Sequence, residues 1–392
     1  MRNTLSKAHQ FHCFFLASSL ATFILAPSTH AAPIKLTLQP APENRRFVVV
    51  EQIIPESQLA APYIVHDSKT GQVLASQWES ADGKSTLRFV VPSLEANQSR
   101  AFTIEHATDQ HVPGNFLLKD NNGALAISTA TRQITTYHYG PWAAQFKKPF
   151  FYPVIAHGVQ VTRGAPMQPK PGEETDHPHH TSLFFAHGEV NGKDYWSKLP
   201  ISHTRFLKQS SGPVYARLIA ENAWGADVVE TQDITIYDAG EDVLMDWVIS
   251  LKATNGPVHL GKTKEGGFGP RVATGLTAKG GGQMMDGKGN KGEPAIRADN
   301  AAWADDYGAV DGQPVGIAIM NHPSSFRFPT NWHVRDYGLF VANPFFMQGE
   351  YQLTPDKPIT LKYRLYIHGG DPAAGKVQEV YAGYTNAQVK AE

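Results

Sequence analysis

The sequence has a single cysteine, Cys13, among its 392 residues. One thiol cannot form a disulfide framework, so the fold must depend on packing and hydrogen bonds. The sequence also lacks a charge excess, because 35 basic side chains balance 36 acidic ones. A protein that coats nucleic acid needs a clustered basic surplus, so nucleic acid is not an expected partner.

Long apolar runs are also missing, except near the start of the chain. Basic residues there precede an apolar run over residues 11–25, and the small-residue pattern Thr29-His30-Ala31 follows. This order is typical of a secretory signal peptide that is cleaved after Ala31. We therefore predict a signal peptide over residues 1–31, a periplasmic or secreted protein, and no membrane span after the signal is removed.

Turn-forming residues, in contrast, are abundant, since the chain has 34 glycines and 27 prolines. Between them apolar and polar residues alternate, most clearly over residues 243–251 and 360–368. Alternating segments joined by short turns predict antiparallel sheets in a sandwich or barrel, and hence an all-β fold. One short helix is expected at the C-terminal end, where Asp371 is a capping residue and apolar residues at 377–384 share one stripe.

The strand pattern divides the chain into two blocks. Strand-like runs between residues 46 and 106 form a compact first block, and the segment His111-Val112-Pro113-Gly114 interrupts the pattern. We therefore predict a small N-terminal β domain over residues 32–112. A larger β-sandwich domain that ends in the C-terminal helix is predicted over residues 113–392.

The densest group of chemically active side chains is the segment DHPHHTSLFFAHGE at residues 176–189. In an extended chain, His177 and His179 point to one side and His180 to the other. Two imidazoles on one side can share a substrate or a metal ion. The alternative is a polar loop whose histidines form hydrogen bonds with the backbone.

The second candidate segment is KTKEGGFGPR at residues 262–271. Its Glu265 is the most attractive general base in the sequence. Lys264 precedes this glutamate and Arg271 ends the segment, so cations are available for an anionic group. The glycines between them allow a ligand to approach the main chain closely. The alternative is a bulged strand that carries surface charges.

The third candidate segment is NWHVRDY at residues 331–337, where apolar and polar residues alternate as in a strand. One face of such a strand carries Trp332, Val334 and Asp336. The other face carries His333, Arg335 and Tyr337. A row of imidazole, guanidinium and phenol groups is typical of the lining of a polar substrate cleft, and the alternative is an outer face exposed to water.

Together these segments resemble a family of exported bacterial proteins known as PmoA-like. The matching stretches are DHPHH at 176–180 with FAHGEVNG at 185–192, KEGGFG at 264–269, and WHVRDYGL at 332–339 with ANPF at 342–345. The family often has a basic residue followed by glycine after the histidine pair, where this chain has Thr181-Ser182. The resemblance implies an architecture similar to the galactose-mutarotase-like β-supersandwiches, preceded here by the small β domain, and a role in handling sugars.

The first functional hypothesis is an exported carbohydrate-active enzyme without a cofactor. His179 and His180 would polarise or protonate a ring or glycosidic oxygen, and Glu265 would accept a proton. Epimerisation, β-elimination and hydrolysis all fit such an acid–base set. The expected partner is a sugar or oligosaccharide, and its predicted binding residues are His187, Lys264, Arg271, Trp332, His333, Arg335 and Tyr337.

Two alternatives remain open. One is an enzyme that depends on a divalent metal ion held by His177, His179 and a third ligand such as His187 or His333. The other is a non-catalytic glycan-binding protein. Such a protein would use rings that stack on sugar C–H faces and carboxylates that accept hydroxyl protons, as in the patch WADDY at residues 303–307.

Overall fold

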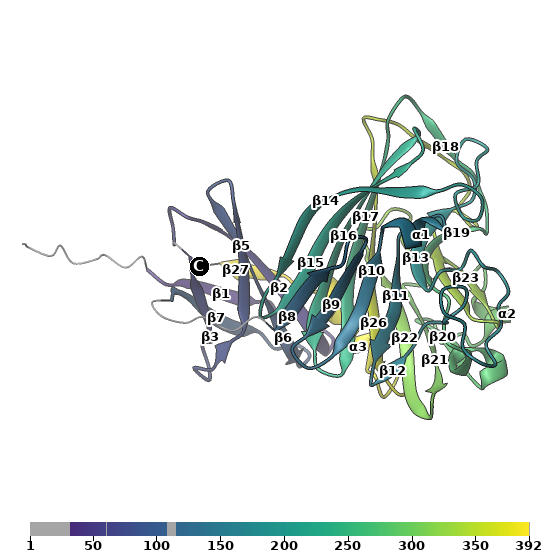
Figure 1. Cartoon of the computed structure of the whole chain (residues 1–392). Helices are drawn as coiled ribbons and strands as arrows, with labels where there is room; N and C mark the ends of the chain where they lie inside the picture. The colour runs from purple at the N-terminus through teal and green to yellow at the C-terminus, as the bar shows by residue number, and fades with distance from the viewer. Residues whose placement is uncertain (1–31, 60, 108–114, 392) are drawn as a thin grey trace, which may run out of the picture. The chain divides into compact units, whose positions relative to one another are not determined.

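The computed structural model describes residues 32–59, 61–107 and 115–391 (Figure 1). The signal peptide predicted over residues 1–31 and the boundary predicted at residues 112 and 113 lie outside these ranges. The described chain is all-β, as predicted, and is built of antiparallel sheets. Its α-helices are α1 (Pro141–Ala144), α2 (Glu293–Ile296) and α3 (Val377–Thr385), and its 3-10 turns are Thr274–Leu276 and Ala278–Gly280.

The first block of strands forms two sheets around a hydrophobic core of their own, which includes Leu36, Val50, Phe89 and Phe102. One sheet has the order β27-β1-β7-β3-β4 and the other the order β2-β6-β5. The strands are β1 (Ile34–Leu38), β2 (Arg45–Pro55), β3 (Tyr63–Asp67), β4 (Val73–Leu74), β5 (Ser76–Ala81), β6 (Lys84–Leu94), β7 (Arg100–His106) and β27 (Val389–Ala391). Because β27 pairs with β1, the C-terminal strand completes this block.

A nine-stranded sheet carries the segments singled out in the sequence. Its order is β23-β24-β19-β13-β11-β10-β9-β8, with β12 paired to β11. The strands are β8 (Phe116–Asp120), β9 (Ala124–Thr129), β10 (Gln133–His138), β11 (Phe150–Ala156), β12 (Val159–Gln160), β13 (Leu183–His187), β19 (Gly266–Pro270), β23 (Asn331–Arg335) and β24 (Leu339–Asn343).

An eight-stranded sheet has the order β14-β15-β16-β17-β26-β22-β21-β20. Its strands are β14 (Ile201–Ser211), β15 (Tyr215–Trp224), β16 (Val228–Ala239), β17 (Asp242–Ala253), β20 (Gln283–Asp286), β21 (Trp303–Val310), β22 (Gln313–Asn321) and β26 (Ile359–Gly369). The two alternating runs predicted from the sequence are β17 and β26, which pair with each other. A short ribbon of β18 (Val258–Leu260) and β25 (Tyr351–Leu353) completes the described strands.

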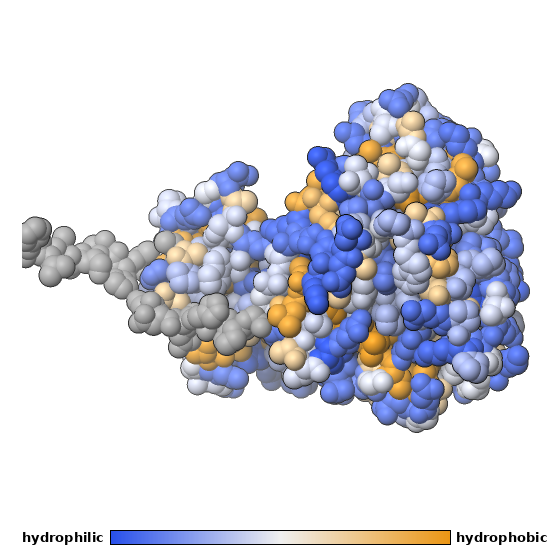
Figure 2. All heavy atoms as spheres, viewed as in Figure 1, coloured by the Kyte–Doolittle hydropathy of each residue, from blue (hydrophilic) through white to orange (hydrophobic). Residues whose placement is uncertain are grey.

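Aromatic side chains fill the space between the nine-stranded and eight-stranded sheets. Phe185 of β13 lies 5.7 Å from Trp224 of β15, and Phe268 of β19 lies 4.6 Å from Trp247 of β17, between ring centroids. Since side chains alternate along a strand, the neighbours of Phe185 and Phe268 point to the opposite face of the nine-stranded sheet. Hydrophilic side chains cover most of the face seen in Figure 2, and hydrophobic ones form separate patches there.

The C-terminal helix begins later than the sequence predicted. Asp371 accepts hydrogen bonds from the amides of Ala373 and Ala374, so it stabilises a turn that precedes α3. The helix itself starts at Val377, whose side chain is buried together with Val380. Asparagine, aspartate and serine stabilise isolated turns as well as helix starts, which explains the error. Within the described ranges no helix is long and apolar enough to cross a membrane.

Candidate functional site

The three candidate segments lie on neighbouring strands of one sheet. β13 pairs with β19, β19 pairs with β24, and β24 pairs with β23. The histidine-rich segment runs into β13, the Glu265 segment runs into β19, and the third segment forms β23 and the turn after it. Hydrogen bonding between the strands therefore unites stretches that are far apart in the sequence.

A hollow of about 800 Å³, measured to its open mouth, lies on this part of the sheet. Its lining includes His177 and His179 from the first segment, Lys264 and Glu265 from the second, and His333, Arg335 and Tyr337 from the third. The alternation predicted for β23 therefore matches the structure. Trp332 and Val334, on the other face of the strand, are buried in the core between the sheets.

Two residues predicted to bind substrate do not line this hollow. Trp332 is 0% exposed, stacks on Phe340, and donates its Nε1–H to the carbonyl of Ala301 at 3.2 Å. His187 is 1% exposed, and its Nε2 lies 3.1 Å from the carbonyl oxygen of Gly261. Both predictions were wrong because a conspicuous residue type does not reveal which face of a strand looks into the core.

The alternative metal site is not assembled. The rings of His177 and His179 are 5.7 Å apart between centroids, but His187 is enclosed elsewhere on β13. In the described part of the chain, no three His, Cys, Asp or Glu side chains are arranged to hold a metal ion. The donor set proposed from the sequence therefore does not fit a metal centre.

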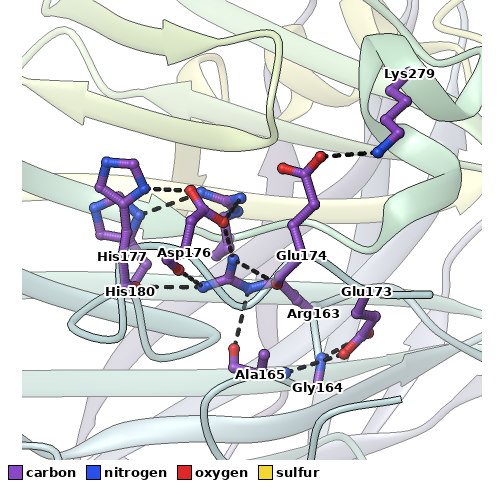
Figure 3. A network of polar contacts seen from close by, with 10 residues as sticks. Arg163, Gly164, Ala165, Glu173, Glu174, Asp176, His177, His180 and Lys279 are labelled. Atoms are coloured by element: carbon purple, nitrogen blue, oxygen red, sulfur yellow. Dashed lines mark hydrogen bonds and ion pairs between the residues drawn. The ribbon is translucent and has the colours of Figure 1, made fainter. Parts of the chain in front are cut away.

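Asp176 is the centre of a polar network beside the hollow (Figure 3). Its Oδ1 accepts hydrogen bonds from Arg163 at 2.7 Å and from Arg271 at 2.8 Å, and its Oδ2 is bonded to Nδ1 of His177. Burial alone would raise the pKa of Asp176, but the bond to His177 and the two guanidinium charges hold it below its usual value. The anionic carboxylate fixes the His177 ring, and Nε2 of this ring has no partner among the described residues.

Two buried side chains, His180 and Arg271, pack against the rings of His177 and Tyr337. The His180 ring is parallel to that of His177 at 4.9 Å, and the Arg271 guanidinium lies 4.4 Å from the centre of the Tyr337 ring. Each side chain is 1% exposed. Burial, together with nearby positive groups, lowers the pKa of His180 far below its usual range, so the ring is neutral at pH 7. The predicted catalytic role of His180 and the predicted substrate contact of Arg271 are therefore replaced by support of His177 and Tyr337.

Two neutral imidazoles border the hollow. Burial lowers the pKa of His333 to about 4, and burial together with the Lys148 charge lowers that of His179 to about 4. His333 is 2% exposed, and neither of its ring nitrogens has a hydrogen-bond partner within the described chain. A buried polar group without a partner is costly, so His333 is prepared to bond with a ligand or water.

Charged groups of both signs lie around the imidazoles. Lys264 is 3.0 Å from the carboxylate of Glu265, whose side chain is 39% exposed. Arg335 forms an ion pair with Glu293 at 2.9 Å and lies over the ring of Tyr337. Glu265 is therefore accessible from the hollow, and the two cations remain close enough to stabilise negative charge on a ligand.

Sequence reasoning missed several residues of the site. The buried Lys148 donates to the carbonyls of His179 at 3.0 Å and Trp196 at 2.7 Å, and burial lowers its pKa to about 7. Asp194 accepts from the amides of Trp196 and Ser197, and these three residues line the hollow. Nothing in the pair Lys147-Lys148 distinguishes it from surface lysines. The adjacency of Asp176 and His177 was a signal that could have been used.

The sequence matches the family of unknown function DUF6807 over residues 124–382, and the chain belongs to this family. The matched range contains all the segments that build the hollow. No curated protein sequence matches the chain.

Two solved structures show a similarity to most of this chain. A protein in glycosyl hydrolase family 38 from Enterococcus faecalis has a TM-score of 0.46 and 13% identity, over 92% of this chain and 47% of that one. An alpha-mannosidase from Enterococcus faecalis V583 has a TM-score of 0.41 and 16% identity, over 92% of this chain and 46% of that one. The chain thus spans about half the length of these proteins.

Proposed function

We propose that this protein is an enzyme that performs general acid–base chemistry on a carbohydrate in the hollow beside His177. One observation carries the proposal. An imidazole oriented by the carboxylate of Asp176 borders the same hollow as His333, whose buried ring nitrogens have no partner in the described chain. Oriented and unpaired imidazoles are typical of groups that exchange protons with a substrate.

His177 is the proton acceptor in this proposal. Because Asp176 holds Nδ1–H, the lone pair of Nε2 is available to take a proton. The imidazolium that forms is stabilised by the same carboxylate, which stays anionic between Arg163 and Arg271. His333 is neutral above about pH 4, so one of its nitrogens donates and the other accepts.

The variety of polar groups in the hollow supports a hydroxyl-rich substrate. Ser197, His333 and Glu265 offer donors and acceptors, and Lys264 and Arg335 offer positive charge. The neighbouring hydroxyls of a sugar are both donors and acceptors, so they are suited to such a mixed lining.

Hydrolysis of a glycosidic bond ordinarily requires two carboxyl groups beside the bond. Glu265 is one candidate, but Asp194 is already bonded to two amides and to the Ser197 hydroxyl. A lyase or an epimerase that acts on an acidic sugar fits the residues better. His177 would remove the proton from the carbon next to the sugar carboxylate, and Arg335 and Lys264 would stabilise the enediolate that receives the electron pair.

The two reactions differ in how this intermediate decays. An epimerase returns a proton from solvent to the opposite face of the same carbon, and His177 releases the proton it took to solvent. A lyase expels the glycosidic oxygen from the next carbon, which leaves a C=C bond, and the departing oxygen receives the proton that His177 removed. Both begin with loss of the same C–H proton, so one experiment detects either.

The test is incubation of the purified protein with oligogalacturonides, alginate oligosaccharides and glucuronate oligosaccharides in D₂O. We expect deuterium in the sugar by mass spectrometry, or an unsaturated product by ultraviolet absorbance. His177→Ala should lower the rate about 100-fold or more, since general-base catalysis contributes 10² to 10⁴. His259→Ala is the matched control, because this half-exposed histidine of β18 pairs with Glu350 away from the hollow.

Deuterium uptake or product formation that is equal in the wild type and in His177→Ala would remove His177 as the base. Binding of these sugars without any exchange or product would instead favour the glycan-binding alternative.

Export and kinship with the PmoA-like proteins are further proposals. The signal-peptide pattern over residues 1–31 supports export, and the shared motifs support the kinship. Mass spectrometry of the protein recovered from a periplasmic extract should give an N-terminus at Ala32. Protein in that extract that still begins at Met1 would contradict cleavage.

A further inference from the structure

A second hollow, of about 610 Å³, lies beside the turn that joins β23 and β24. Arg335 lines both this hollow and the one that contains His177. The rest of its lining includes Gln283 and Lys291, which are exposed at the rim, and Asp306. A ligand that occupies both hollows would therefore pass the Arg335 side chain.

Asp306 is the unusual group in this second hollow. It belongs to β21, is 1% exposed, and has a buried Oδ1 without a hydrogen-bond partner in the described chain. Its neighbour Asp305 bonds instead to Nε2 of His368 at 3.0 Å. Because side chains alternate along a strand, the two carboxyl groups point to opposite faces of the sheet, and only Asp306 reaches the hollow.

The chemistry of Asp306 determines what it can bind. Burial, and then the charges of Asp305 and Asp336, raise its pKa well above the usual value, which favours the protonated carboxylic acid. Such a group has one O–H donor and acceptor oxygens, as the partner of a hydroxyl must. A ligand hydroxyl would offset the cost of burying this group alone.

A third hollow, around Arg163 and Arg271, is a weaker candidate. The guanidinium groups there already bond to Asp176, and Arg163 also bonds to the carbonyls of Glu174 and His177. All three nitrogens of Arg163 are bonded within the chain, so Arg163 has little hydrogen-bonding capacity left for a ligand.

We infer that the hollow containing Asp306 is a second sugar subsite and that the substrate is an oligosaccharide of at least two units. One unit would lie at His177 and another at Asp306, on either side of Arg335. This inference rests on the proposed carbohydrate substrate. It extends that proposal because the affinity must increase with the length of the oligosaccharide, and this increase must depend on the carboxyl group of Asp306.

The test is calorimetric titration with oligogalacturonides and alginate oligosaccharides of one to four units, using the His177→Ala protein so that the ligands stay intact. We expect the affinity to rise tenfold or more from one unit to two or three. Asp306→Leu should abolish this increase and leave the affinity for the single unit unchanged. Asp306→Asn should preserve most of the increase, because an amide still donates and accepts.

Lys291→Trp provides a second variant that does not alter the buried carboxyl group. Lys291 is exposed at the rim of the hollow, so the substitution should preserve the fold while a large ring fills the space. The same loss of the length-dependent increase is expected. An increase that survives in both Asp306→Leu and Lys291→Trp would overturn the inference, as would affinity that does not depend on length or binding of none of these oligomers.

The two proposals fail in different ways. Length-dependent binding without any reaction in the wild type would contradict the proposed catalysis and support the subsite. Turnover of a sugar without length-dependent binding would contradict the subsite alone.

Discussion

Asp176 and His177 are consecutive in the chain, and the carboxylate of the first is bonded to the ring of the second. His177 adopts a positive φ of 47°, a backbone conformation that is uncommon outside glycine. Two buried arginines hold the carboxylate in position. The orientation of one half-exposed imidazole thus depends on a network whose other members are more deeply buried.

The first prediction concerns the charge of this carboxylate. Asp176→Asn keeps the size of the side chain, but it removes the negative charge and replaces one acceptor oxygen by an NH₂ donor. An NH₂ group facing Nδ1 of His177 favours the tautomer without a proton on Nδ1. We expect kcat to fall about 10²- to 10⁴-fold, because the wrong histidine tautomer is stabilised. The rate on the responsive oligosaccharide measures this effect.

Glu174→Gln is the control for this variant, since Glu174 pairs with Lys279 on the exposed side of the network. A full rate in Asp176→Asn would show that His177 does not depend on its neighbour. The melting temperature of Asp176→Asn should also fall, because Arg163 and Arg271 lose their common counter-charge.

The second prediction separates two buried histidines. His333→Leu removes an imidazole that has no partner in the described chain, so the free energy of unfolding should stay equal or rise by about 1–2 kcal/mol. Activity should nevertheless fall about 100-fold, because the hollow loses a donor and an acceptor. Denaturant titration and a rate assay on the same protein measure both effects.

His187→Leu should behave in the opposite way. It leaves the Gly261 carbonyl without its imidazole partner, so the free energy of unfolding should fall by about 1–3 kcal/mol while kcat is unchanged. If His333→Leu proved the more destabilising of the two, the view of His333 as a group kept for ligand binding would be wrong.

The third prediction concerns the pH dependence of stability. Glu230 is buried between the sheets beside Trp224, and burial raises its pKa to about 7 from an ordinary 4.5. Between these pH values the native protein retains a proton that the unfolded chain has released. Stability should therefore decrease by about 3 kcal/mol as the pH rises from about 4.5 to about 7, and should not change further from this group above pH 7.

Urea titrations of the wild type and of Glu230→Gln across this pH range test the prediction. The variant should lack this part of the pH dependence, whereas Glu56→Gln, at an exposed position, should retain it. Parallel pH curves for the wild type and Glu230→Gln would show that Glu230 ionises normally in the native state.

The fourth prediction follows from the burial of Trp332. Trp332→Ala should lower the free energy of unfolding by about 3–5 kcal/mol, because it opens a cavity in the core. Trp332→Phe should bind and convert the substrate with an unchanged KM. A large rise in KM for Trp332→Phe would instead support the substrate contact that was predicted from the sequence.

Local patterns explain why much of the fold was predictable. The alternation over residues 243–251 and 360–368 reports which side of each strand is buried, and these runs form β17 and β26. The same rule separated His333 and Arg335 from Trp332 on β23. The rule is local because the period of two comes from the geometry of the strand itself.

Other features depend on neighbours that the sequence does not reveal. His180 and Arg271 resemble catalytic and binding residues in the sequence, but they are 1% exposed beneath His177 and Tyr337. Lys148 looks like half of a surface lysine pair, but it bonds to the carbonyl of His179. Burial is a property of everything that packs on a side chain, so short sequence motifs cannot specify it.

The sequence by itself determined that the chain is all-β and which functional groups are available, because alternation and residue type are written along the chain. The tertiary structure decided the strand order β23-β24-β19-β13, which brings His177, Glu265 and Arg335 to one hollow. Strand order depends on hydrogen bonding between segments far apart in the sequence, and any antiparallel edge offers the same backbone groups. Only the packing of the complete sandwich selects one pairing among many.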